Sequence, residues 1–474
     1  MTKISEMQAA PGARPLYNKD TIAATATAPG AAGIGIIRIS GPGAIEVADK
    51  MVFKKNRGEL SVSGQPSHTV RYGFVYDGEE PLDEVLVSVF RAPRSYTAED
   101  TVEISCHGGN YVLRRVLSLC LKSGARLAEP GEFTKRAFLN GRIDLTEAEG
   151  VMDLISAGNE FARKNSLSAL RGKILEKIVK LREEILTEAA FIESAIDDPE
   201  HYSLDDYPPA LREKLRGLIQ EMNRLIADSE TGRVLKEGIK TVILGKPNVG
   251  KSSVLNLLTG EDTAIVTDIP GTTRDVLSSE INLKGIPLIL YDTAGIREAG
   301  DKVERIGVDR SREMLKKADL VLFILDSAEE LTPEDREIYE SIISEGKKAL
   351  ILNNKTDLKR QRKDLSCFDL PVIEFSAKEE TGIDELSDMI GKMFLSDGSA
   401  YREEVYITQA RQVESLRAAV RSLELVIKSI DDKMTEDFFS SDLMDAYSCL
   451  GNIIGEETDE DLFDMIFSKF CMGK

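Results

Sequence analysis

The sequence of 474 residues lacks several features that would place it in a special class of protein. It has no apolar run that approaches the roughly 20 residues needed for a membrane-spanning helix. Its first residues lack the apolar core of a secretory signal peptide. Its five cysteines are an odd number and include no Cys-x-x-Cys pair, which argues against a disulfide framework and a zinc site. We therefore expect a cytoplasmic protein without a membrane association.

The sequence is also poor in positive charge. It has 61 Lys and Arg against 81 Asp and Glu, a net charge of −20, and a polyanion does not attract nucleic acid by diffuse charge. Residues 1–140 differ, because their 17 basic and 15 acidic residues give +2. An RNA partner would need a local basic patch or a second protein, and the alternative is ordinary surface charge. The candidates for such a patch are Arg114, Arg115, Lys135 and Arg136.

Changes in composition predict several domains, as the chain length also suggests. Short β-branched runs punctuated by Gly and Pro predict an α+β domain near the N-terminus. Apolar residues then recur every three or four positions from Ile174 to Ile192, which predicts helix. The expected segments are a disordered extension at 1–19, the α+β domain at 20–140, a first helical part at 141–237, an inserted α/β domain at 238–397, and a second helical part at 398–474.

The strongest local signal is TVILGKPNVGKSSVLNLL, in which a short apolar strand leads through a glycine-containing loop into a helix. Glycines let backbone amides surround phosphate oxygens, and the helix N-terminus favours negative charge. Lys251 is expected to reach the β and γ phosphates, and Ser252 to offer a hydroxyl to Mg²⁺. The loop residues expected to contact the nucleotide are Asn248, Val249, Gly250, Lys251, Ser252 and Ser253.

Further motifs follow in the order that a GTPase requires. They are DIPGTTRD, DTAG, NKTD and SAK, and the last three each follow an apolar strand. Thr273 is expected to bind Mg²⁺, and Asp357 to select guanine over adenine, because adenine lacks the N1 and N2 donor pair. The ordered set predicts GTP binding by a Ras-like, doubly wound sheet. The expected GTP contacts are Thr267, Asp268, Ile269, Pro270, Gly271, Thr272, Thr273, Asp292, Thr293, Ala294, Gly295, Asn354, Lys355, Asp357, Ser376, Ala377 and Lys378.

The residue that would activate water is missing from its usual place. In small switch GTPases a glutamine directly after DTAG orients the attacking water, and here that position is Ile296. Either hydrolysis is slow or another group supplies the function. The local candidates are Asn248, Arg274 and Glu304.

The chain closes with FSKFCMGK, which places a thiol and an ammonium at the end. Cys471 holds the first position of a lipidation box, but Gly473 and Lys474 do not fit its later positions. A frayed terminus is the ordinary alternative. Four apolar residues before the tail recur at helical spacing and predict an amphipathic helix that holds the tail near the body: Leu462, Met465, Ile466 and Phe470.

Across nearly its full length the chain resembles the MnmE family of tRNA-modification GTPases, also called TrmE. The matching stretches are DTIAATATAPGAAGIGIIRISGPGA, PRSYTAEDTVEISCHGGN, EPGEFTKRAFLNGRIDLTEAEGVMDLI, GKPNVGKSS, DIPGTTRD, DTAGIREAGDKVERIG and FCMGK. The resemblance implies a multidomain α/β and α protein. Its parts are a folate-binding and dimerising N-terminal domain, a helical domain, and an inserted Ras-like P-loop GTPase (G) domain.

For GTP hydrolysis, the resemblance implies stimulation by K⁺ when two G domains meet across a homodimer. Asn248 would bind K⁺, with Thr267, Ile269 and Thr272 as further ligands. The cation would neutralise charge that develops in the transition state. Glu304 matches the family's water-orienting carboxylate.

For the second cofactor, the resemblance implies 5,10-methylene- or 5-formyl-tetrahydrofolate. The matching positions are Arg38, Glu103, Arg142 and Lys474. A carboxylate can pair with the aminopyrimidine edge of the pterin, and cationic groups suit the carboxylates of the glutamate tail. The chain end would fold back toward this site and bring Cys471 near the one-carbon unit.

The implied function is the addition of an aminomethyl-type group to carbon 5 of the wobble uridine of certain tRNAs. The implied partner is the flavoprotein MnmG, or GidA, in a heterotetramer that supplies redox chemistry and RNA-binding surface. Two alternatives remain open. One is a ribosome-assembly or signalling GTPase switch, and the other is a folate-dependent transferase whose G domain is a regulatory insert.

Overall fold

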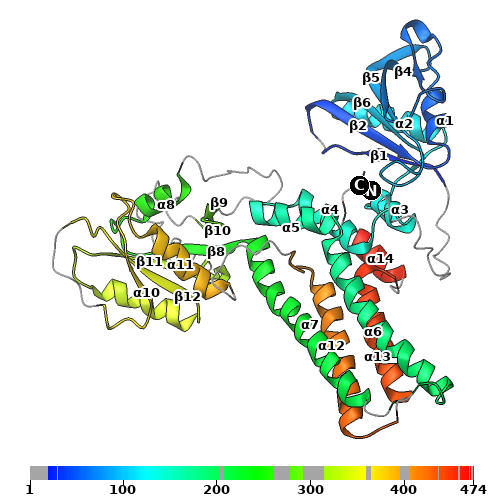
Figure 1. Cartoon of the computed structure of the whole chain (residues 1–474). Coiled ribbons are helices and arrows are strands. Elements are labelled where there is room, and N and C mark those ends of the chain that lie inside the picture. The colour runs from blue at the N-terminus through cyan, green and yellow to red at the C-terminus, as the bar shows by residue number, and fades with distance from the viewer. Residues whose placement is uncertain are drawn as a thin grey trace. The chain divides into compact units, whose positions relative to one another are not determined.

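The computed structural model describes most of the chain, in two compact units. The first unit comprises residues 1–152 with 454–474, and the second comprises residues 153–453 (Figure 1). Among the described residues, no helix combines the length and the apolar character needed to span a membrane. The described residues are 20–28, 30–202, 204, 207–260, 278–291, 314–358, 365–395, 405–435, 437–456, 460–468, 470 and 473.

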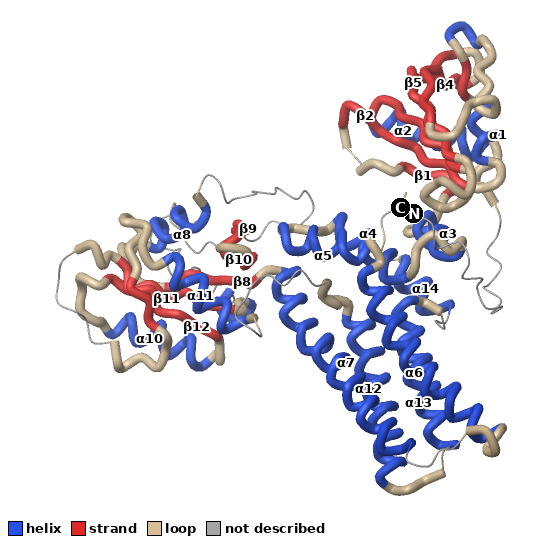
Figure 2. Tube along the Cα trace, viewed as in Figure 1, coloured by secondary structure: helices blue, strands red, loops and turns tan. Residues whose placement is uncertain are grey.

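The first unit contains a seven-stranded sheet in the order β3-β4-β5-β6-β2-β1-β7, drawn in red in Figure 2. Most neighbours are antiparallel, and β7 pairs parallel to β1. The short β-branched runs of this domain, TIAATATA, GIGIIRIS, EVLVSVF and TVEISC, lie in or overlap β1, β2, β5 and β6, which confirms that the domain contains strands. The strands are β1 (Ile22–Thr25), β2 (Ala32–Ser40), β3 (Val52–Phe53), β4 (Thr69–Asp77), β5 (Glu80–Phe90), β6 (Thr101–Gly108) and β7 (Arg126–Leu127).

Two helices, α1 (Ala44–Asp49) and α2 (Asn110–Lys122), pack on one face of this sheet. A short 3-10 helix, η1 (Lys55–Arg57), precedes β4. At Gly35 the sheet and α2 approach so closely that an added Cβ would lie 2.6 Å from the Leu113 side chain. The core formed there is aliphatic and includes Ile37, Ile39, Val87, Val102, Ile104, Leu113 and Val116.

Cys106 and His107 lie on opposite faces of β6, as successive strand residues do. The Cys106 thiol is buried and donates to the Gly35 carbonyl over 3.4 Å. Burial raises its pKa to about 11. The His107 side chain is 70% exposed and pairs with Asp83. Because the two side chains diverge, they do not form a shared metal site, and Cys106 is part of the buried core.

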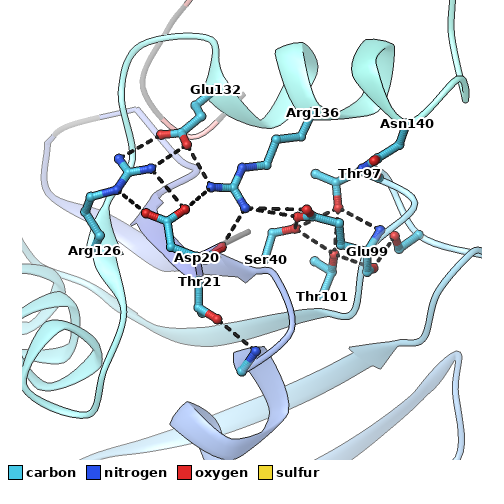
Figure 3. Close-up of polar contacts among 12 residues, drawn as sticks. Asp20, Thr21, Ser40, Thr97, Glu99, Thr101, Arg126, Glu132, Arg136 and Asn140 are labelled. Atoms are coloured by element: carbon cyan, nitrogen blue, oxygen red, sulfur yellow. Dashed lines mark hydrogen bonds and ion pairs between the residues drawn. The ribbon is translucent and has the colours of Figure 1, made fainter. Parts of the chain in front are cut away.

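A buried guanidinium organises the edge of the first unit (Figure 3). Arg136 is 1% exposed and lies in α3 (Glu132–Leu139). Its guanidinium pairs with Asp20 at 2.7 Å, with Glu132 at 2.8 Å and with Glu99 at 3.3 Å. Hydrogen bonds from Arg126 and Arg136 lower the pKa of Asp20 against the opposing effect of burial. The suggestion that Arg136 belongs to a surface patch for RNA is therefore wrong, because buried ion pairs occupy its charge.

The C-terminal helix α14 (Glu460–Phe467) packs against α3 through aromatic rings. The ring centroid of Phe138 lies 5.1 Å from that of Phe463 and 6.5 Å from that of Phe467. The amphipathic helix is confirmed, but the predicted buried face is partly wrong, because Met465 is 57% exposed. The helix ends at Phe467, so Phe470 does not continue its periodicity, and the phenylalanines form the buried side instead.

The second unit contains long helices that run alongside one another (Figure 1). Arg212 pairs with Asp431 and joins α7 to α12. The Arg182 guanidinium lies 4.0 Å from the Tyr447 ring centroid and joins α6 to α13. The helices that follow α3 are α4 (Leu145–Ile155), α5 (Glu160–Leu170), α6 (Lys173–Asp197), α7 (Tyr207–Glu237), α12 (Ala410–Asp431) and α13 (Asp437–Ile454).

The predicted apolar stripe of α6 is confirmed, because all its members are buried: Ile174, Ile178, Leu181, Ile185, Ala189 and Ile192. The helical region that begins at Leu145 and includes this stripe consists of three helices. The first interruption lies before α5, which begins at Glu160 with Asn159 as its N-cap. The second lies at Gly172, whose φ of 76° is incompatible with a continuous α-helix. Helix α7 takes Pro208 and Pro209 into its first turn, where they lose no helical hydrogen bond.

The second unit also contains a six-stranded sheet in the order β13-β12-β11-β8-β10-β9. All pairs are parallel except β9 with β10, which confirms the predicted Ras-like doubly wound sheet. The strands are β8 (Ile239–Leu244), β9 (Ser278–Leu283), β10 (Ile286–Tyr291), β11 (Leu320–Asp326), β12 (Lys348–Asn354) and β13 (Val372–Glu374). The associated helices include α8 (Lys251–Thr259), α10 (Pro333–Ser344) and α11 (Ile383–Phe394).

Replacement of the buried guanidinium should loosen the first unit. In Arg136→Met the carboxylates of Asp20, Glu99 and Glu132 lose their ion pairs with Arg136, and breaking a buried pair costs about 3–5 kcal/mol. We expect the free energy of opening of β1 and α3 to fall by that order, as measured by hydrogen exchange in urea. Arg126→Met is the matched control, because its side chain is 42% exposed and its loss should cost about 1 kcal/mol. Equal losses in both variants would contradict this role for burial.

Candidate functional site

The phosphate loop of the second unit connects β8 to α8. Gly245 and Gly250 have φ of 149° and 100°, and Asn248 has φ of 67°, so the loop needs residues that tolerate positive φ. The Lys251 ammonium donates to the carbonyls of Gly245 and Lys246, each over 2.6 Å. The ammonium therefore lies over the loop in which phosphates are expected, and Ser252 is exposed in the first turn of α8.

The NKTD motif supports the phosphate loop from the neighbouring strand end. The Asn354 amide donates to the Val249 carbonyl over 2.9 Å and accepts from the Ala377 amide over 3.1 Å. A Cβ on Gly250 would collide with this Asn354 side chain, so glycine is required there. Lys355 donates to the Asn248 carbonyl over 2.8 Å. Motifs that are distant in sequence thus hold one another in place.

The SAK segment meets the carboxylate that would recognise the base. The Ser376 hydroxyl donates to Asp357 Oδ1 over 2.8 Å, and Lys378 Nζ lies 3.9 Å from Asp357 Oδ2. Ser376 is 1% exposed. This arrangement fixes the orientation of the Asp357 carboxylate at the edge of the sheet, where it can accept hydrogen bonds from a planar base.

Other predicted residues lie outside the described part of the chain. These are Thr267, Asp268, Ile269, Pro270, Gly271, Thr272, Thr273, Arg274, Asp292, Thr293, Ala294, Gly295, Ile296, Glu304, Cys471 and Lys474. The described part of the nucleotide site therefore comprises the phosphate loop, NKTD and SAK.

Sequence reasoning missed a buried ion pair beneath the phosphate loop. Lys246 Nζ lies 3.0 Å from Asp335 Oδ2, and the Asp335 side chain is 0% exposed. The same carboxylate oxygen accepts from the amide and hydroxyl of Thr332, which caps α10. The Lys246 carbonyl accepts from Lys251, so the pair connects α10 to the loop that carries the ammonium. Nothing in the local motif signals this partner, which comes from a distant helix.

A second group of predicted residues meets in the first unit. Arg38 and Glu103 are directly opposite on β2 and β6. Arg38 Nε and Nη2 each lie 2.8 Å from Glu103 Oε1. Arg38 Nη1 donates to the Gly473 carbonyl over 3.1 Å. The side chains of Arg38 and Glu103 are 16% and 23% exposed, so Gly473 lies beside a partly buried ion pair.

Aromatic rings complete this cluster and were missed from sequence. The Arg38 guanidinium lies 5.3 Å from the Tyr96 ring centroid and 5.7 Å from that of Phe133. Arg142 lies 5.1 Å from the Tyr96 ring and donates to the Tyr96 carbonyl over 2.8 Å. Flat rings beside guanidinium groups can stack on a planar heterocycle, while the charged groups can bind its polar edge. The only sequence signal was the position of both aromatics within motif stretches.

Two carboxyl groups meet at the start of α4, close in sequence to Arg142. Asp144 accepts from the Thr146 hydroxyl and amide, each over 2.6 Å, and its own amide donates to Glu147 over 2.9 Å. Burial raises the pKa of Glu147 to about 7, and the charge of Asp144 adds to this shift. Glu147 can therefore exchange a proton near neutral pH.

Comparisons with known proteins cover the entire described architecture. Residues 21–142 match the model of the GTP-binding protein TrmE N-terminus, and residues 145–471 match that of the MnmE helical domain. The tRNA modification GTPase MnmE of Lachnoclostridium phytofermentans is 51% identical over 96% of this chain and 99% of its own. The proteins of that name from Alkaliphilus oremlandii and Bacillus subtilis are 46% and 45% identical, over 97% and 96% of this chain and 100% of their own.

Loss of the buried pair under the phosphate loop should weaken nucleotide retention. In Lys246→Met the Asp335 carboxylate stays buried without its counter-charge, a change that costs several kcal/mol. We expect a fluorescent GDP analogue to dissociate at least roughly ten-fold faster in stopped-flow measurements, and Lys246→Arg to restore most of the difference. Lys284→Met, which removes an exposed pair with Asp384, is the control. Unchanged release in Lys246→Met would refute this role.

Proposed function

Because the chain belongs to the MnmE family of tRNA modification GTPases and is a GTPase of this kind, we propose that it installs an aminomethyl-type group at carbon 5 of the wobble uridine. The one-carbon unit would come from 5,10-methylene-tetrahydrofolate, with the 5-formyl form as an alternative ligand. The observation that carries the proposal is the presence, in one chain, of a nucleotide site and of the cluster around Arg38.

In the proposed hydrolysis, each described residue has a defined task. Lys251 binds the β and γ phosphates, Ser252 binds Mg²⁺ together with Thr273, and Asp357 selects guanine. Asn248 fits a K⁺ site, because its side chain is exposed at the loop while Lys355 holds its carbonyl. The other proposed K⁺ ligands are Thr267, Ile269 and Thr272. Bound K⁺ would supply positive charge toward the phosphates, and Glu304 would orient the attacking water.

In the proposed folate site, the Arg38 and Glu103 pair faces the pterin. A carboxylate oriented by a guanidinium can accept two hydrogen bonds from an aminopyrimidine edge. Tyr96 offers a ring face, and Arg142 offers a cation for the glutamate tail. The contact of Arg38 with Gly473 supports a role for the chain end, with Lys474 as a folate ligand and Cys471 near the one-carbon unit.

We also propose a cytoplasmic homodimer that joins the flavoprotein MnmG, or GidA, in a heterotetramer acting on tRNA. The sheet face opposite α2 supports dimerisation, because Val70, Tyr72 and Leu86 are 59%, 56% and 48% exposed there. Tyr72 and Leu86 are directly opposite in register, so these residues form a continuous apolar strip. The net charge of −20 supports a partner that provides most of the RNA-binding surface.

Potassium should accelerate GTP hydrolysis through Asn248. At equal ionic strength we expect a rate in KCl at least roughly ten-fold above that in NaCl, equal to about 1.4 kcal/mol of activation free energy. Asn248→Ala should erase the difference, because it removes a K⁺ ligand. The control Asn256→Ala changes an exposed asparagine on α8 and should keep the stimulation. Equal rates in the two salts would remove the K⁺ mechanism.

Binding of a reduced folate should depend on Arg38. Loss of a hydrogen bond to a charged group costs about 2 kcal/mol, so Arg38→Met should weaken 5-formyl-tetrahydrofolate binding by roughly 30-fold in calorimetry. Arg71→Met on β4 is the matched control, since Arg71 bonds only to the Ser61 carbonyl among its described contacts. GTP binding should be unchanged in both variants. A parent chain that hydrolyses GTP and binds no reduced folate would instead favour a ribosome-assembly or signalling switch.

A further inference from the structure

Two segments connect the helical domain to the G domain, and we call them crossings. Both crossings contact the same helix. The chain enters the G domain where α7 ends and β8 begins, at Gly238 with φ of 77°. It returns through residues 405–409 to the start of α12. Helix α5 contacts both crossings, although it belongs to neither.

At the first crossing, a single side chain joins two helix ends. Asn159 caps α5, because its Oδ1 accepts from the Ala162 amide over 2.8 Å. Its Nδ2 donates to the carbonyls of Leu235 and Lys236 over 3.1 and 3.2 Å. These carbonyls belong to the last turn of α7, whose acceptors have no partners within the helix. Asn159 thus ties the N-terminus of α5 to the C-terminus of α7.

At the second crossing, another asparagine of α5 holds the returning chain. Asn165 Nδ2 donates to the Tyr406 carbonyl over 3.1 Å, and its Oδ1 accepts from the Tyr406 amide over 2.8 Å. The Tyr406 ring lies edge-on to Phe161, with 5.4 Å between centroids. On its other side, a Cβ added to Gly232 of α7 would lie 2.6 Å from Tyr406 Cβ. These contacts fix the position of Tyr406 along α5.

The two crossings are also tied to each other. The Asp153 carboxylate accepts from Lys236 of the outgoing chain over 2.7 Å and from Gln409 of the returning chain over 3.1 Å. Its side chain is 16% exposed, so water screens these contacts only partly. A domain attached through one flexible crossing can rotate relative to the rest of the chain. When both crossings are bound to one helix, the domain must move with that helix.

We call α5 with its two asparagines, Asn159 and Asn165, the clamp. The clamp also contacts the G-domain sheet. Phe161, Leu235 and Tyr406 share an apolar cluster with Ile281 of β9 and Leu288 of β10. A cavity of about 340 Å³ lies beside the clamp, lined by residues that include Asp153, Gly158, Asn159, Glu280, Ile281 and Pro287.

We propose that Asn159 and Asn165 are positioning residues that transmit nucleotide-dependent movement of the G domain into the helical domain. They take no part in hydrolysis, and they make hydrolysis effective for tRNA modification. The inference therefore rests on the proposed function for its biological consequence. Its structural content, that α5 fixes both crossings, is independent of the substrate.

The first test separates hydrolysis from modification in the full-length chain with its flavoprotein partner. In Asn165→Ala both hydrogen bonds to Tyr406 are lost, and in Asn159→Ala the link to α7 is lost. We expect K⁺-stimulated GTP hydrolysis within about two-fold of the parent, and wobble-uridine modification at least roughly ten-fold slower, within the range of known coupling between sites. Asn165→Asp keeps the acceptor for the Tyr406 amide and should be affected less.

The matched control is Arg163→Ala on the same helix. Arg163 is exposed and pairs only with Glu160 among its described contacts, so both activities should stay at the parent level. Hydrolysis and modification that fall together in the asparagine variants would indicate a general structural role and overturn the proposal. Full modification in both asparagine variants would overturn it as well.

The second test measures the coupling without tRNA. Spin labels at Glu221 of α7 and Glu340 of α10, both exposed, report the distance between the helical and G domains in a background without Cys367, Cys449 and Cys471. We expect narrow distance distributions that shift between GDP and GDP with aluminium fluoride, and broad distributions without that shift in Asn165→Ala. An identical shift in the variant would refute the clamp. If the shift is present in the labelled parent but the unlabelled chain, with all its cysteines, modifies no tRNA with its partner, the proposed function alone would be refuted.

Discussion

The buried charge of Arg136 is the constraint on which the cluster around Arg38 depends. A guanidinium removed from water must keep its counter-charges, and these come from three separate places: Asp20 before β1, Glu99 before β6, and Glu132 in α3. The segments cannot separate without leaving a charge unpaired. The loop that carries Tyr96 and the helix that carries Phe133 are therefore held on one side of the sheet, where β2 presents Arg38.

The nucleotide site follows the same principle with different groups. A phosphate loop has no hydrogen-bonded ladder of its own, so its backbone groups must be satisfied by side chains from other segments. Asn354 and Lys355 accomplish this from the end of β12, and Lys246 extends the support to α10. In both units, long-range polar contacts give a loop the fixed shape that ligand binding requires, and α5 applies the same device to the two domain crossings.

The predictable features were those with local causes. The strand, loop and helix around Lys251 follow from apolar pattern and glycine placement within a short window, and the stripe of α6 follows from helical periodicity. Predictions from the sequence were wrong where the burial of a side chain depends on partners far away in the chain. Arg136 carries a charge that usually lies on the surface, and three acidic neighbours from separate segments make its burial possible. Met465 fits the apolar period, yet the buried side of α14 is the one that carries Phe463 and Phe467, which pack against Phe138 of α3.

The doubly wound sheet, the order of the nucleotide motifs and the family could all be inferred before the fold was known, because each depends on residues close together in the chain or on similarity along its length. Three features became visible in the folded chain: Tyr96 and Phe133 flank Arg38, Asp335 lies under the phosphate loop, and α5 fixes both crossings. Such contacts join segments far apart in the chain. Their geometry is set by the packing of whole elements, which no short window of residues specifies.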